Sequence, residues 1–404
     1  MQSQPHRDAI SRPRIPKTIW MLGFVSLFTD MSSEIVHALL PIMLASGLGA
    51  SALVIGLIEG SAEALVMATK VFSGYVSDAI GKRKPLVLFG YGLAAIVKPI
   101  FPLADSVWLF TTARMLDRFG KGVRGAPRDA MVSELSPPEI RGASFGLRQS
   151  MDTVGAVLGP LLAVGLLWWT MNDIKLVLWI AVIPGFIAVL LILTSVPEPD
   201  DAQLKPARLP ISREGLRQLG KPYWSLVAVG AVIALARFSE AFLILRASNL
   251  HVSLTYIPLV LVIMSVVYAL SAYPVGKLSD RMPRHLLLAS GMVLLAIACL
   301  ILAVATNYWM LFFGIALWGL HMGFTQGILA SMVADTANES YRATAFGVFN
   351  LVSGLGLFLA SGIAGLLWEK IDPSASFVFG SAISVLSVIL ILRRSVAAAH
   401  TALE

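Results

Sequence analysis

Long apolar runs recur along the whole sequence, and they constrain the fold more than any other feature. A helix that spans a bilayer needs about 20 apolar residues. Twelve segments meet this requirement: Ile19 to Leu44, Leu53 to Val76, Leu86 to Leu103, Trp108 to Val132, Phe145 to Trp169, Leu176 to Leu193, Leu226 to Leu245, Ile257 to Gly276, Leu286 to Ala305, Trp309 to Val333, Phe346 to Trp368 and Phe377 to Leu392. The pattern predicts an all-α integral membrane protein with twelve transmembrane helices.

The composition excludes the common soluble classes. Of the 404 residues, 57% are hydrophobic and only 14% are charged, whereas soluble domains carry about 25% charged residues. The single cysteine, Cys299, can form no disulfide within the chain. The sequence contains no phosphate-binding glycine loop, no metal-ligand spacing and no nucleophile elbow. We therefore expect no metal, no cofactor and no nucleic-acid partner, and we do not expect an enzyme.

The distribution of Lys and Arg predicts the orientation in the membrane. Nineteen of these residues fall in the N-terminal tail, alternate loops and the C-terminal end, while the opposite side holds only Lys175 and Lys370. Cytoplasmic loops accumulate positive charge, so both termini are expected in the cytoplasm and the net charge of +7 is an orientation signal. We find no removable signal peptide before Ile19. A bacterial inner membrane is the expected location.

Two halves of the chain resemble one another. Gly74-Tyr-Val-Ser-Asp78 recurs as Gly276-Lys-Leu-Ser-Asp280, at an offset of 202 residues, and Arg141-Gly-Ala-Ser-Phe-Gly146 recurs as Arg342-Ala-Thr-Ala-Phe-Gly347. Such a repeat predicts two pseudo-symmetric six-helix bundles with a binding site between them. The predicted parts are a tail (1–18), a first bundle (19–195), a basic linker (196–222), a second bundle (223–394) and a tail (395–404).

The loop after the second span carries a family resemblance. Gly74-x-x-x-Asp78-x-x-Gly81-Lys82-Arg83-Lys84 is similar to the loop signature of major facilitator superfamily transporters, and a partial second copy contains Gly276 and Asp280. The resemblance implies the major facilitator fold. It also implies a cytoplasmic gate motif, formed by Gly74, Asp78, Gly81, Lys82, Arg83, Gly276 and Asp280, which locks the outward-facing state. The alternative is that these loops only fix the topology.

Glycines in the fifth span resemble a second signature of the superfamily. Gly146, Gly155, Gly159 and Pro160 are similar to the antiporter motif of proton-coupled drug and metabolite exporters, although the final Gly-Gly pair of that motif is Ala163-Val164 here. The resemblance implies efflux. A tight helix–helix contact explains the same glycines, because small residues let two helices approach closely.

Charged residues inside the apolar segments indicate an internal cavity. A charge at the bilayer centre costs at least about 2.5 kcal/mol, so each one should face water or a partner. The candidates for a substrate and proton cavity are Asp30, Glu34, Glu59, Glu63, Arg114, Asp117, Arg118, Arg148, Asp152, Arg237 and Glu240. Among them, Asp30, Glu34 and Glu59 or Glu63 are the expected proton carriers and Arg118 the switching cation. For Arg148 and Asp152 a static ion pair is equally compatible, and Lys98 is expected to extend toward the membrane surface.

Together these observations predict a secondary active transporter. We expect a monomer that moves a small polar or amphipathic solute, anionic or zwitterionic, by alternating access and proton-coupled antiport. Its partners would be the lipid bilayer, the solute and protons. The alternatives are a proton symporter or uniporter that imports a small metabolite, a transport-fold sensor, and a membrane enzyme that uses the intramembrane carboxylates.

Overall fold

The computed structural model describes residues 15–199, 211, 213–337 and 341–401, and in this part of the chain it contains helices and no strand. The helices of the first half are α1 (Lys17–Ile42), α2 (Ala52–Ile80), α3 (Lys84–Val97), α4 (Ile100–Leu103), α5 (Val107–Glu134), α6 (Arg141–Trp169) and α7 (Ile174–Ser195). Those of the second half are α8 (Arg213–Gln218), α9 (Lys221–Ala236), α10 (Ala241–Asn249), α11 (Leu259–Ser279), α12 (Arg284–Val304), α13 (Tyr308–Thr336), α14 (Arg342–Lys370) and α15 (Pro373–Thr401). A π-helical turn, η1 (Met43–Gly47), extends α1, and η2 (Pro138–Ile140) and η3 (Leu254–Tyr256) are short 3₁₀ turns.

Eleven helical segments of the described residues are long and apolar enough to cross a membrane. The prediction of an all-helical membrane protein is therefore confirmed. The predicted fourth span is not among the eleven. It corresponds to α5, which has 28 residues and packs against α2 and α3, but which carries Arg, Lys and Asp along its length.

Polar side chains define where several helices begin. Ser51, Ser106, Asp173 and Asn307 precede α2, α5, α7 and α13, and each accepts a hydrogen bond from a backbone N–H of the first turn. These bonds satisfy donors that have no partner within the helix. At the other end of α2, Gly81 adopts a left-handed conformation (φ 71°) and its N–H donates to the Ser77 carbonyl. Glycine tolerates this conformation, so the predicted motif residue Gly81 ends the helix.

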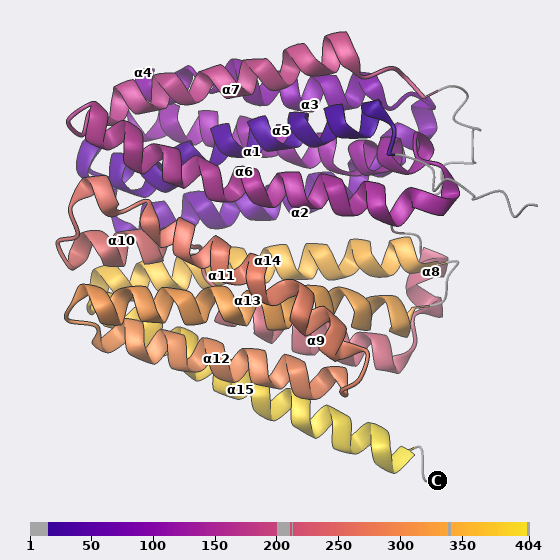
Figure 1. The fold of residues 1–404 in the computed structure, drawn as a ribbon. Helices are drawn as coiled ribbons and strands as arrows, with labels where there is room; N and C mark the ends of the chain where they lie inside the picture. The colour runs from indigo at the N-terminus through magenta and orange to yellow at the C-terminus, as the bar shows by residue number, and fades with distance from the viewer. Residues whose placement is uncertain (1–14, 200–210, 212, 338–340, 402–404) are drawn as a thin grey trace, which may run out of the picture.

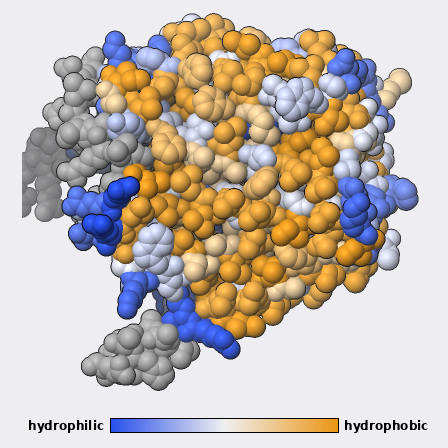
Figure 2. Space-filling model, turned by 180° about the vertical axis from the view of Figure 1, so that it is seen from behind, coloured by the Kyte–Doolittle hydropathy of each residue, from blue (hydrophilic) through white to orange (hydrophobic). Residues whose placement is uncertain are grey.

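The helices group by their position in the chain. In Figure 1, α1 to α7 lie together above α9 to α15, and the described parts nearest both chain ends lie on the same side of the molecule. Contacts between the two groups include α2 with α14, α6 with α11 and α1 with α10. Figure 2 shows a broad apolar surface across the face in view, with hydrophilic residues at two opposite edges. This distribution suits a bilayer, whose hydrocarbon core accepts apolar side chains.

Small residues bring α2 and α14 into close contact at the end of the molecule away from the chain ends. A Cβ atom added to Gly56 would stand 2.3 Å from the Ser361 carbonyl oxygen, and one on Gly365 would stand 2.6 Å from the Leu53 Cα atom. In the neighbouring loops, the Thr255 hydroxyl donates to Asn172 Oδ1 at 2.8 Å. The two groups of helices are therefore tightly joined at this end.

Two predicted spans are interrupted. The third is interrupted at Lys98 and Pro99, between α3 and α4. The seventh, predicted as one helix from Leu226 to Leu245, breaks at 237–240 between α9 and α10. The predicted linker contains a short helix, α8. Residues 200–210, residue 212 and most of the predicted N-terminal tail lie outside the described residues.

Candidate functional site

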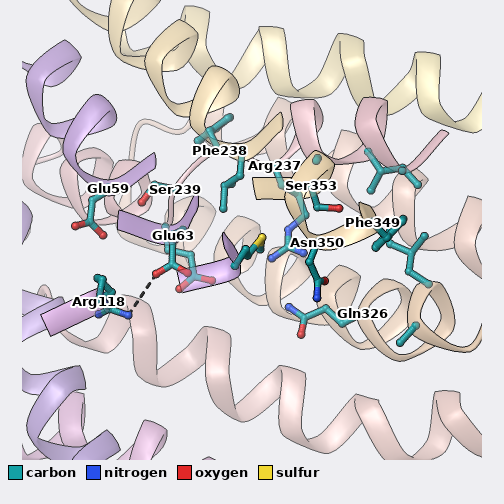
Figure 3. A pocket seen from close by; sticks show the side chains of 18 of the residues that line it. Glu59, Glu63, Arg118, Arg237, Phe238, Ser239, Gln326, Phe349, Asn350 and Ser353 are labelled. Carbon is teal, nitrogen blue, oxygen red and sulfur yellow. Dashed lines mark hydrogen bonds and ion pairs between the residues drawn. The ribbon is translucent and has the colours of Figure 1, made fainter. Parts of the chain in front are cut away.

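A cavity of ≈ 570 Å³ lies between the two groups of helices, and both contribute to its wall. The first half supplies Glu34, His37, Glu59, Glu63, Met67, Arg118 and Lys121 from α1, α2 and α5. The second half supplies Arg237, Phe238, Ser239 and Glu240 from the break after α9, together with Trp318, Gln326, Phe349, Asn350 and Ser353 from α13 and α14. Figure 3 shows Glu63 and Arg118 on one side of this space and Arg237, Asn350 and Gln326 on the other. The volume falls within the range of small-molecule sites.

A buried ion pair joins α2 to α5 at the wall of the cavity. Glu59 accepts two hydrogen bonds from Arg114, one from Nε at 2.8 Å and one from Nη2 at 2.6 Å. Both side chains are 1% exposed. On the cavity side, His37 Nε2 stands 3.6 Å from Glu59, and His37 Nδ1 stands 3.2 Å from Glu34. Arg114 therefore acts from behind the cavity lining and fixes Glu59 in place.

A second pair links α2 and α5 one turn further along. Arg118 Nη1 lies 3.3 Å from Glu63 Oε1, and its Nη2 has no hydrogen-bond partner among the described residues. Behind Arg118, Asp117 lies 3.2 Å from Lys98 Nζ. Lys98 is 1% exposed and also bonds to Ser33. The prediction that Lys98 extends toward the membrane surface is wrong, because an internal carboxylate satisfies its charge.

Three of the predicted cavity residues gather in another cluster, nearer the chain-end side of α5 and α6. Arg148 Nη1 lies 2.5 Å from Asp152 Oδ2. Arg128 Nη1 lies 3.8 Å from Asp152 Oδ1, and Asp129 Oδ1 lies 3.8 Å from Arg148 Nε. Asp30 lies on the face of α1 that packs against Gly155. None of Asp30, Arg148 and Asp152 contributes to the cavity wall, and neither do Arg114 and Asp117.

Hydrogen bonds and aromatic contacts hold the break between α9 and α10 in place. The Ser239 N–H donates to the Ser361 hydroxyl at 3.0 Å, and the Ser239 hydroxyl accepts from the Ala241 N–H at 3.2 Å. The Phe238 ring packs against Phe242 and Trp318, each with centroids 5.4 Å apart. Non-helical backbone at membrane depth is tolerated where it lines a cavity, and this segment does so.

The first copy of the predicted gate motif forms a dense set of contacts. The Arg83 guanidinium donates to Asp78 at 2.6 Å, to Ser77 at 2.8 Å and to Glu134 at the end of α5 at 3.1 Å. Glu198 accepts from the Arg83 backbone N–H at 2.6 Å. Burial alone would lower the pKa of Arg83, but the hydrogen bonds to Glu134 and Asp78 outweigh it and raise this pKa.

The second copy of this loop motif makes fewer contacts among the described residues. Arg284 pairs with Asp335 at the end of α13, and these positions repeat Arg83 and Glu134 at an offset of 201 residues. Asp280 is exposed. Glu134 and Asp335 are not predicted from the sequence, although their shared offset of 201 residues could have identified them.

Glycines of α6 allow α1 to approach closely. A Cβ atom on Gly155 would stand 2.6 Å from the Leu27 carbonyl oxygen, and one on Gly159 would stand 2.7 Å from that of Met31. Pro160 is buried in the same helix. Gly146 has open space around it and takes no part in this contact, and Gly74 and Gly276 make no close approach either.

The aromatic residues of the cavity were not identified from the sequence. Phe238, Trp318 and Phe349 line it, but they lie within apolar runs in which a cavity residue and a core residue look alike.

Comparisons with known proteins agree with this architecture. The model of the Major Facilitator Superfamily matches residues 22–245 and 226–403. An uncharacterised MFS-type transporter of Methanocaldococcus jannaschii is 34% identical over 387 residues, covering 94% of this chain and 95% of the relative. Multidrug resistance protein MdtH of Yersinia pestis is 29% identical over 160 residues, or 40% of this chain and 39% of its own. A crystal structure of a POT family transporter in complex with a thioalcohol-conjugated peptide has a TM-score of 0.79 at 13% identity, covering 94% of this chain and 96% of that one.

Proposed function

Because this chain belongs to the major facilitator superfamily, we propose that it moves a small polar or amphipathic solute across a membrane by proton-coupled antiport. Its family and its relatives make it a transporter rather than an enzyme. The observation that carries the proposal is the cavity between the two halves of the chain, whose wall holds carboxylates and cations from both. Transporters of this architecture bind their solute between repeats and expose it alternately to each side.

The proposal includes a twelve-helix architecture. We assign α5 as the twelfth span, since it matches the other spans in length and packs between α2 and α3. Its charges are compatible with a membrane because they pair with residues of neighbouring helices, as Arg114 does with Glu59. The two six-helix bundles would then be 19–195 and 223–394. The protein would act as a monomer in a bacterial inner membrane, with both termini in the cytoplasm.

Proton coupling is supported by the ion pairs at the cavity wall. Glu34 and Glu63 are held by His37 and Arg118, respectively, and all four side chains line the cavity. A carboxylate takes up a proton more readily once its cationic partner moves away. A rocking motion that alternately forms and breaks these pairs would therefore couple proton binding to solute movement. Asp30, which lies outside the cavity wall, is a weaker candidate on this geometry.

Export is supported by similarity over part of the chain. The relative named multidrug resistance protein MdtH matches 160 residues, and Gly155 and Gly159 of the antiporter-like motif pack α6 closely onto α1. The alternative is import of a small metabolite by proton symport or uniport, which the same cavity would allow.

Proteoliposomes with a pH-sensitive dye in the lumen test this proposal. Radiolabelled amino acids, carboxylates and amines are added outside, and uptake and lumen pH are followed together. Antiport predicts that uptake makes the lumen more alkaline, whereas symport predicts acidification and uniport no change. Glu63→Gln should abolish the pH change, and Glu139→Gln, at an exposed position, should preserve it. Uptake no greater than in empty liposomes for every compound would refute the proposal.

A further inference from the structure

The arginines near the cavity differ in what they bind. Arg114 is committed to Glu59, Arg118 to Glu63 and Arg148 to Asp152. The Arg237 guanidinium faces the cavity and makes no hydrogen bond or ion pair with the residues that the structure describes. The lining contains two arginines, Arg118 and Arg237. Arg237 is only partly buried and is the one without an ion-pair partner, so its guanidinium is available for a ligand.

Two amides complete a set of donors around Arg237. Figure 3 shows Asn350 and Gln326 on the same side of the cavity as Arg237. Gln326 Oε1 accepts from the Tyr268 hydroxyl at 3.1 Å, so its amide hydrogens remain free to donate. A planar guanidinium beside amide N–H groups suits a carboxylate, which arginine can bind through two parallel hydrogen bonds.

The break between α9 and α10 also supplies a negative charge, the Glu240 carboxylate. Glu240 lines the cavity, and its carboxylate has no hydrogen bond or ion pair with any described residue. Glu34 and His37 are among the groups whose charge acts on it. An ammonium group of a ligand would therefore find carboxylate acceptors at Glu240 and Glu34. Lys121 lies on the same wall as Glu34 and Glu63 and partly offsets their charge.

The cavity wall holds charges of both signs. Glu34, Glu59, Glu63 and Glu240 face Arg118, Lys121 and Arg237 in the lining, and Arg114 lies directly behind Glu59. Arg237 and Glu240 have no ion pair among the described residues, and a solute that carries one charge of each sign would give each of them a partner.

We propose that the transported solute is a small zwitterion, whose carboxylate binds Arg237 with Gln326 and Asn350 and whose ammonium group binds Glu240 with Glu34. The break between α9 and α10 is then the recognition element, because it presents Arg237 and Glu240 from one short segment. This inference rests on the proposed transport function and narrows its solute class.

Binding to the purified full-length protein in detergent tests the inference without transport. The probes are linear ω-amino acids of two to six carbons, compared at equal concentration with dicarboxylates, diamines, monocarboxylates and monoamines of the same length. A ligand that binds the folded state raises its unfolding temperature. We expect at least one ω-amino acid to raise it, and no probe of the other classes to do so.

Matched variants identify the binding groups. Arg237→Gln and Glu240→Gln should each weaken binding of that ω-amino acid by about tenfold to a hundredfold, as loss of a charged hydrogen bond does. Arg217→Gln and Glu214→Gln, at exposed positions of α8, should bind as the unmodified protein does. No shift with any ω-amino acid, a larger shift with a dicarboxylate or diamine, or unchanged binding in Arg237→Gln would overturn the inference.

Transport assays separate the two proposals. If an ω-amino acid binds but is not taken up by proteoliposomes, the zwitterion site stands and the transport function fails for that solute. If the protein transports anions or cations and binds no zwitterion, the transport function stands and the zwitterion inference fails.

Discussion

Replacing Glu59 with Gln tests how far the first half of the protein depends on charges paired inside it. The carboxylate and Arg114 are each 1% exposed, and the pair is held by hydrogen bonds of 2.6 and 2.8 Å. Removing one partner of such a pair leaves an uncompensated buried charge and costs about 3–5 kcal/mol. Because the amide oxygen of Gln can still accept one bond from Arg114, we expect a loss near the lower limit, about 3 kcal/mol.

The measurement is the free energy of unfolding in mixed detergent micelles, with Glu139→Gln as a control at an exposed position. Arg114→Gln and the double variant complete a double-mutant cycle, which isolates the coupling between the two side chains. We expect the double variant to be less destabilised than the sum of the single variants. A loss below about 1 kcal/mol in Glu59→Gln, typical of exposed ion pairs, would show that water reaches this pair and would refute the reasoning.

Three further outcomes follow from the packing and the charges. Gly159→Ala should cost about 1–3 kcal/mol of unfolding free energy, because the new Cβ would stand 2.7 Å from a carbonyl oxygen of α1. The control Gly165→Ala, at a position with open space around it, should change the unfolding free energy by less than about 0.5 kcal/mol. Equal losses for the two variants in the same detergent titration would contradict the contact. Lys98→Met should cost about 3 kcal/mol, because it removes the cation 3.2 Å from Asp117 and leaves this buried carboxylate with only Arg118 Nε, at 3.6 Å; adding Asp117→Leu should recover part of that loss, and a double variant less stable than Lys98→Met would argue against the pair. Arg83→Gln should speed hydrogen exchange of backbone amides in the loop after α2, since it removes several side-chain bonds, and unchanged exchange by mass spectrometry would contradict this.

The sequence predicts the helices well because a lipid bilayer permits few backbone conformations other than the helix. A long apolar run must satisfy its backbone hydrogen bonds internally, so each predicted segment is largely helical, although the third and the seventh are each divided between two helices. The break after α9 could not be predicted in this way. It contains neither proline nor glycine, and its backbone is satisfied by Ser361, which is 122 positions away in the chain. A partner so distant leaves no local signal.

The candidate site shows the same limit. Helical spacing places Arg114 and Arg118 on one face of α5, but it does not indicate which neighbouring helix each of them meets. Arg114 is held behind the cavity by Glu59, whereas Arg118 is part of the wall. Lys98 is similar, since only the packing of α3 against α5 reveals that Asp117 is within reach. Sequence periodicity thus predicts that charges share an interior, while tertiary contacts decide which of them can meet a solute.

The repeated loop contacts at the chain-end side give the two halves different sensitivity to ionic strength. In the first half, the Arg83 side chain is 10% exposed and bonds several acceptors, whereas Arg284 and Asp335 in the second are 34% and 63% exposed. Salt screens exposed charges far more than buried ones. Concentrated electrolyte would therefore release the tie between α12 and α13 first, and it would leave the α2–α3 turn in place.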